Sequence, residues 1–71
     1  MTLRMGKKSC KYRVENSPDH HLLRVLGIRP GIELLVQSRQ PLDGPVVVRL
    51  ASRSIAIASQ LAQEISIREV V

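Results

Sequence analysis

The stretch Leu26–Val36, LGIRPGIELLV, places two glycines and a proline between apolar residues. Gly27 follows the last residue of an apolar helical pattern, at a position that favours a left-handed backbone, which glycine adopts without strain. Pro30 and Gly31 then fit a type II turn, because proline fixes φ and glycine accepts a positive φ. The sequence therefore predicts a helix that stops at Gly27 and a turn that leads into a strand over residues 32–39.

The segment before Gly27 predicts a short amphipathic helix. Ser17 fits the N-cap, Pro18 the first helical position and Asp19 the positive end of the helix dipole. Four apolar residues form a stripe wider than one end of a small barrel requires, so we expect Leu23 or Val25 to stay partly exposed and to contact a partner. The alternative is that the whole stripe lies in the core. The candidate partner-binding residues are Leu22, Leu23, Val25 and Leu26.

The rest of the chain predicts short strands. Alternation over Ser9–Glu15 places Cys10, Tyr12 and Val14 on one face, which is typical of a half-buried strand. Asp43-Gly44 is a hairpin signal between two strands. The other predicted elements are strands over residues 46–50, 54–58 and 65–71, the last with Ile65 and Ile67 inward, and a helical turn over residues 59–64 capped by Ser59. Five short strands, one short helix and one helical turn predict a mainly β fold, a small closed or nearly closed barrel, in one domain over residues 1–71.

The composition limits the possible functions. Tyr12 is the only aromatic residue among 71, so the core must be aliphatic and base stacking is disfavoured. The formal charge is +5, from 11 Lys and Arg against 6 Asp and Glu. Many of these cations lie near the N-terminus, where they either solubilise the chain or attract nucleic acid, an anionic membrane or an acidic partner. The cations concerned are Arg4, Lys7, Lys8, Lys11 and Arg13.

The residues that could carry chemistry are few. Cys10 is the only cysteine, which favours a reducing compartment. No apolar stretch is long enough for a membrane span or a signal peptide. We therefore expect a soluble cytoplasmic protein. His20 and His21 point about 100° apart on a helix and suit surface positions better than a metal site, although Cys10 could join them if the fold brings it close. No nucleophile elbow, phosphate-binding loop or paired carboxylates are present. We therefore predict no catalytic, cofactor-binding or metal-binding residues and no enzymatic activity.

Three quoted segments together resemble the FeoA family, ferrous iron transport protein A. They are LLRVLGIRPGIELLV (22–36), PLDGPVVVRL (41–50) and SIAIASQLAQEISI (54–67), and Leu3 and Gly6 match the family's usual opening. The resemblance implies an SH3-like β-barrel in the bacterial cytoplasm. It also implies a partner, the membrane GTP-binding ferrous iron transporter, ferrous iron transport protein B, and no active-site residue. The same module occurs in iron-dependent repressors, but the DNA-binding domain is missing here, so a free-standing protein is expected.

Three hypotheses about function follow. The first is an accessory protein that binds the ferrous iron transporter through the apolar helix, with weak contact between its cations and the anionic membrane face. The second is a nucleic-acid-binding module, prompted by the charge of +5 but disfavoured by the lack of aromatic residues. The third is a regulator that binds a transition metal directly through His20, His21 and Cys10. The sequence leaves the oligomeric state open.

Overall fold

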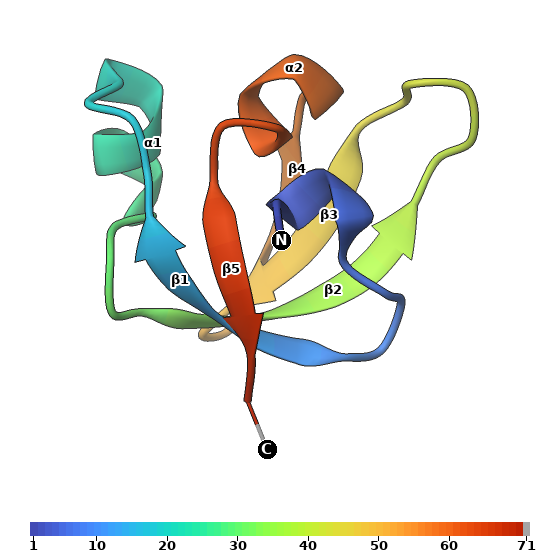
Figure 1. Ribbon diagram of the computed structural model, residues 1–71, viewed down its shortest axis with the longest axis horizontal. Coiled ribbons are helices and arrows are strands. Elements are labelled where there is room, and N and C mark those ends of the chain that lie inside the picture. The colour runs from blue at the N-terminus through green and yellow to red at the C-terminus, as the bar shows by residue number, and fades with distance from the viewer. Residues whose placement is uncertain (71) are drawn as a thin grey trace.

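A five-stranded antiparallel sheet forms most of the protein (Figure 1). The computed structural model describes residues 1–70. The strands are β1 (Lys11–Asn16), β2 (Glu33–Arg39), β3 (Val46–Leu50), β4 (Arg53–Ile57) and β5 (Ser66–Glu69), in the spatial order β4-β3-β2-β1-β5. The helical elements are a 3₁₀ turn η1 (Leu3–Met5), helix α1 (His21–Leu26) and helix α2 (Ser59–Ala62).

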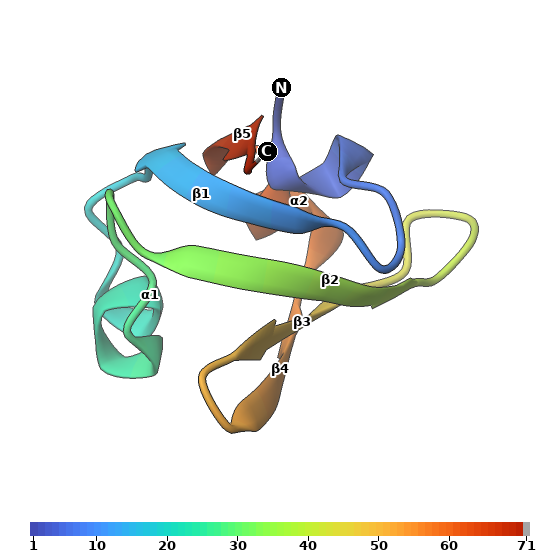
Figure 2. The same ribbon diagram turned by 90° about the horizontal axis from the view of Figure 1, so that it is seen from below.

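The sheet is curled, as Figure 2 shows. The register shifts between Val14 and Asn16 on β1, and again between Val36 and Ser38 on β2. An extra residue of this kind bends its strand and increases the local twist. The molecule measures 26 × 26 × 24 Å, which a flat five-stranded sheet cannot match. The predicted mainly β, SH3-like barrel with five short strands is therefore confirmed.

The core is built from alternating aliphatic residues, as the sequence predicts. Tyr12 and Val14 of β1 point inward, and the Tyr12 hydroxyl accepts a hydrogen bond from the Lys7 backbone N–H at 2.7 Å. Cys10 lies just before β1 and is only partly buried. The buried residues are Leu3, Tyr12, Val14, Leu23, Ile28, Leu34, Val36, Val46, Val48, Ile55, Ile57, Ala62, Ile65 and Ile67.

The N-terminal segment is a structural part of the barrel. The residue pattern of this segment did not predict that role. The Leu3 N–H donates to the Ile65 carbonyl at 2.8 Å, and the Ile67 N–H donates to the Met1 carbonyl at 2.8 Å. These bonds pair the segment with β5, and Leu3 is completely buried. The first residues therefore extend the sheet and cannot be regarded only as a charged end.

The two glycines of the opening stretch adopt the predicted conformations. Gly27 has φ +85°, and the Ile28 N–H donates to the Leu23 carbonyl at 2.9 Å, which completes a Schellman motif. Gly31 has φ +96°, and the Ile32 N–H closes the type II turn onto the carbonyl of Arg29.

Both predicted N-caps are wrong. The N-cap of α1 is His20, whose Nδ1 accepts from the Leu22 N–H at 3.2 Å, and Ser17 lies three residues before it. The His20 N–H bonds to the Pro18 carbonyl, so a tight turn there delays the helix. In α2, Ser59 is the first helical residue, and the N-cap position is Ala58, which makes no side-chain cap hydrogen bond.

The hairpin between β2 and β3 turns one residue earlier than predicted. Leu42 and Asp43 take the positive φ angles, +56° and +65°, and the Gly44 N–H bonds to the Pro41 carbonyl. Gly44 is required for a different reason: a Cβ atom there would lie 2.3 Å from Cβ of Gln40.

Four predicted strands are displaced at their ends. The strands predicted over 9–15, 32–39, 54–58 and 65–71 are observed at Lys11–Asn16, Glu33–Arg39, Arg53–Ile57 and Ser66–Glu69. Val71 lies outside the described residues.

We predict that Gly27→Ala lowers the free energy of unfolding by about 1–2 kcal/mol, because alanine is strained in the left-handed region. Urea unfolding measures this loss. Gly27→Asn is the matched control and should lose less, since asparagine tolerates a positive φ. Equal stability of Gly27→Ala and the wild type would contradict the assigned role of the Schellman motif.

Candidate functional site

Helix α1 divides the four predicted partner-binding residues between core and surface. Leu23 is completely buried, and Leu26 is partly buried against the core. Leu22 is 49% exposed and Val25 is 62% exposed. The alternative that the whole stripe belongs to the core is therefore wrong. We expected Leu23 or Val25 to stay partly exposed, and the exposed residue is Val25. We call Leu22 and Val25 the helix patch.

The helix patch is held in a fixed orientation by contacts at the C-terminal end of α1. The Schellman bond between Ile28 and Leu23 joins two fully buried residues of the core. From β4, Nη2 of Arg53 donates to the carbonyl of Leu26 at 2.7 Å. This bond satisfies a carbonyl that the helix itself leaves unpaired. The role of Arg53 was not predicted from the sequence. Predicting it would have required knowing that β4 lies beside the end of α1.

Cations border the helix patch. Arg24 lies on α1 and forms an exposed ion pair with Asp19, in which Nη1 and Oδ1 are 3.2 Å apart. Arg24 and Arg29 also line a shallow cleft of about 370 Å³ at the C-terminal end of the helix, together with Gly27 and Ile28. The surface thus combines two exposed aliphatic side chains with an Arg24–Asp19 ion pair and with Arg29 at the C-terminal end of the helix, which suits a partner that offers apolar residues flanked by polar and charged groups.

The residues considered for metal binding are not brought together. His20 and His21 are both exposed, as the sequence predicts, and Nδ1 of His20 is occupied by its bond to the Leu22 N–H. Among residues 1–70, no group of three or more His, Cys, Asp or Glu side chains is placed to hold a metal ion. The geometry therefore offers no support for a site that joins Cys10 to the two histidines.

An open cleft of about 790 Å³ lies between η1, the β2–β3 hairpin loop and α2. Asp43 is the one carboxylate that lines it, and this group is ion-paired with Arg4. The remaining polar side chains of the cleft are Ser59, Gln60 and Gln63. A serine and two amides beside a neutralised carboxylate provide no activated nucleophile.

The fold and the helix patch together define a small SH3-like barrel with an apolar surface on helix α1. None of the described helices has the length and apolar character needed to cross a membrane. The chain belongs to the FeoA domain family, which it matches over residues 1–69. Membership in this family supports a role in ferrous iron transport.

Solved structures agree with this assignment. The iron uptake regulatory protein FeoA has a TM-score of 0.87 at 24% identity, covering 99% of this chain and 97% of that one. The FeoA protein from Chlorobium tepidum has a TM-score of 0.86 at 21% identity, covering 100% of this chain and 71% of that one. A manganese-dependent transcriptional repressor has a TM-score of 0.88 at 20% identity, covering 99% of this chain but 41% of the repressor. At these identities the likeness establishes a shared fold. No curated protein matches the chain by sequence.

We predict that Leu23→Ala lowers the free energy of unfolding by about 2–5 kcal/mol, because it leaves a cavity in the core. Val25→Ala should change it by less than about 0.5 kcal/mol, since Val25 is exposed. Urea unfolding of both variants tests this division of α1. Similar losses in the two variants would show that Val25 is also part of the core.

Proposed function

We propose that this protein is a cytoplasmic, non-enzymatic accessory protein of bacterial ferrous iron uptake, and that it binds the cytoplasmic part of the membrane GTP-binding ferrous iron transporter. Membership in the FeoA domain family supports the iron transport setting. The observation that carries the binding proposal is the exposure of Leu22 and Val25 on a helix whose other side is fixed in the core.

The helix patch has the features of a small protein-binding surface. Leu22 and Val25 are three residues apart and therefore lie on neighbouring turns of the same helix face. Fully burying an aliphatic side chain contributes about 1.5–3 kcal/mol, and about half of that remains to be gained here because both side chains are already partly covered. Arg29, at the C-terminal end of the helix, forms no ion pair within residues 1–70 and adds charge complementarity, which favours selectivity and fast association more than affinity.

The anchoring of α1 improves its suitability for binding. A six-residue helix is not stable alone, and a partner that had to order it would lose much of the binding free energy. Here the Schellman motif and the Arg53 bond to Leu26 have already ordered the helix in the free protein. The patch is therefore presented without a folding cost at the moment of binding.

The two other hypotheses gain less support. Proteins that bind single-stranded nucleic acid stack bases on exposed aromatic side chains. Tyr12 is completely buried and its hydroxyl is bonded to the Lys7 N–H, so this chain offers no such surface in the described region. Direct metal sensing lacks a cluster of ligands within residues 1–70.

We predict that the double variant Leu22→Asp/Val25→Asp loses at least about tenfold in affinity for the transporter's cytoplasmic part, because two carboxylates replace apolar contacts and would be desolvated in the interface. Surface plasmon resonance with the immobilised transporter domain measures this change. An unchanged midpoint of unfolding in urea would show that the double variant remains folded.

Leu42→Asn is the matched control, since it also replaces an exposed apolar side chain but lies on the β2–β3 hairpin loop. It should bind the transporter domain like the wild type. Equal affinity of the helix double variant and the wild type would remove α1 from the interface. Failure of the wild type to bind at all would overturn the proposed function.

A further inference from the structure

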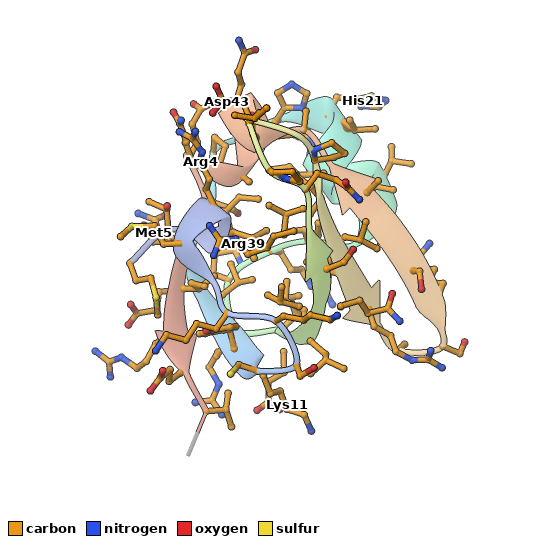
Figure 3. All side chains as sticks on the ribbon, turned by 90° about the vertical axis from the view of Figure 1, so that its right-hand side faces the viewer. Arg4, Met5, Lys11, His21, Arg39 and Asp43 are labelled. Atoms are coloured by element: carbon orange, nitrogen blue, oxygen red, sulfur yellow. The ribbon has the colours of Figure 1, made fainter. Side chains whose placement is uncertain are left out.

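Cations gather at the end of the molecule that lies opposite α1. In Figures 1 and 2, η1, the loop before β1, the end of β2 and the β2–β3 hairpin loop all lie on the right-hand side, whereas α1 lies on the left. Figure 3 faces this side and shows Arg4, Lys11 and Arg39 on it. We define the basic end as Arg4, Lys7, Lys8, Lys11 and Arg39.

The basic end carries most of the net charge of the protein. Its five cations and Asp43, the carboxylate that is ion-paired with Arg4, together sum to +4, against a total of +5 for the chain. Asp43 is ion-paired with Arg4, which ties the hairpin loop to η1. Within residues 1–70, Lys7, Lys8 and Lys11 form no ion pair and are exposed. Their charge is therefore available to an external anion.

Exposed apolar side chains lie among these cations. Leu42 at the hairpin tip is 97% exposed, and Met5 of η1 is 63% exposed and visible beside Arg4 in Figure 3. Leu42 also has φ +56°, a conformation that favours Gly, Asn or Asp over leucine. It therefore adds backbone strain and exposed apolar area without contributing to the core, so folding alone does not account for it.

We infer that the basic end binds the anionic headgroups of a lipid membrane, with Leu42 and Met5 entering the interface between headgroups and acyl chains. The inference rests on the proposed function for its setting beside a membrane transporter. Cations spread over a broad surface complement a plane of lipid phosphates, and apolar side chains among them gain from burial at the interface. A nucleic acid would use the same cations but would gain nothing from Leu42 and Met5.

The arrangement allows two contacts at once. The helix patch and the basic end lie on opposite sides of the barrel (Figure 1), so binding at one leaves the other accessible. A protein held at the membrane by its basic end would present α1 to the cytoplasmic part of the transporter at a raised local concentration.

The test is co-sedimentation of the purified protein with vesicles, in the absence of the transporter. Vesicles of phosphatidylcholine mixed with phosphatidylglycerol should bind the protein, and vesicles of phosphatidylcholine alone should not. Binding should be lost between about 0.1 M and about 1 M salt, over which the Debye length falls from about 10 to about 3 Å. Equal binding to the two kinds of vesicle would overturn the proposal.

Charge variants locate the contact. Each cation at the membrane surface is worth roughly fivefold in binding, so Lys7→Gln/Lys8→Gln should weaken vesicle binding by at least about tenfold. The matched control, Arg29→Gln/Arg68→Gln, removes the same charge from exposed positions outside the basic end and should weaken binding by less than about threefold. An equal effect of the two double variants would show that net charge alone is responsible and would overturn the assignment to this end.

Leu42→Asn tests the apolar contribution at constant charge. Asparagine suits the positive φ of this position, so the variant should fold and bind vesicles about threefold to tenfold more weakly. Unchanged vesicle binding of this variant would exclude insertion of Leu42. In a separate comparison, tighter binding of the wild type to RNA than to anionic vesicles would assign the basic end to nucleic acid instead. The transporter is absent from this experiment, so the vesicle test and the transporter test are independent. A negative vesicle result would not affect the proposed contact through α1, and failure of that contact would not affect the vesicle result.

Discussion

The packing of Leu23 and Ile28 against the barrel core determines how α1 is oriented and which of its side chains face outward. The left-handed turn at Gly27 brings these two residues together and fixes the rotation of α1 about its own axis. A helix of six residues has no stability of its own, so this rotation is set by tertiary contacts. Once Leu23 faces the core, the positions of Leu22 and Val25 on the outer side follow from the helical period.

The barrel can support such a short helix because its own closure does not depend on it. The backbone bonds of Leu3 and Ile67 add the N-terminal segment to the edge of β5, and two irregularities in β1 and β2 curl the sheet around an aliphatic core. Small aliphatic cores have little stability in reserve. The N-terminal segment therefore has two roles: Leu3 completes the core, and its neighbours Arg4 and Met5 belong to the end of the molecule opposite α1.

The regular parts of the fold could be predicted from the sequence, since they depend on local patterns. Alternation indicates that Tyr12 and Val14 face inward, and the two left-handed glycines mark their turns. The position of the hairpin turn could not be predicted from Asp43-Gly44, because Gly44 is required by the close approach of Gln40, a contact between side chain and backbone that composition does not reveal. The N-cap was also unpredictable, because the tight turn after Pro18 moves it to His20.

The candidate site was predictable in place but not in detail. The apolar stripe correctly indicates α1, yet it does not say which of Leu23 and Val25 is buried. The burial of Leu23 could have been predicted from Gly27. A Schellman motif at this glycine places Ile28 against the residue five positions earlier, which is Leu23. The basic end could be found only from the structure, since Arg39 and Leu42 are far from the N-terminal cations in the sequence. The fold brings them to Arg4, which is ion-paired with Asp43 of the same hairpin loop.

Binding through α1 can be tested by a nuclear magnetic resonance titration of the isotope-labelled protein with the cytoplasmic part of the transporter. We expect the backbone amide signals of Leu22 and Val25 to shift on binding, while those of residues 42–44 stay in place. Shifts confined to the outer face of β1, β2 and β3, with the signals of α1 unchanged, would contradict binding through α1.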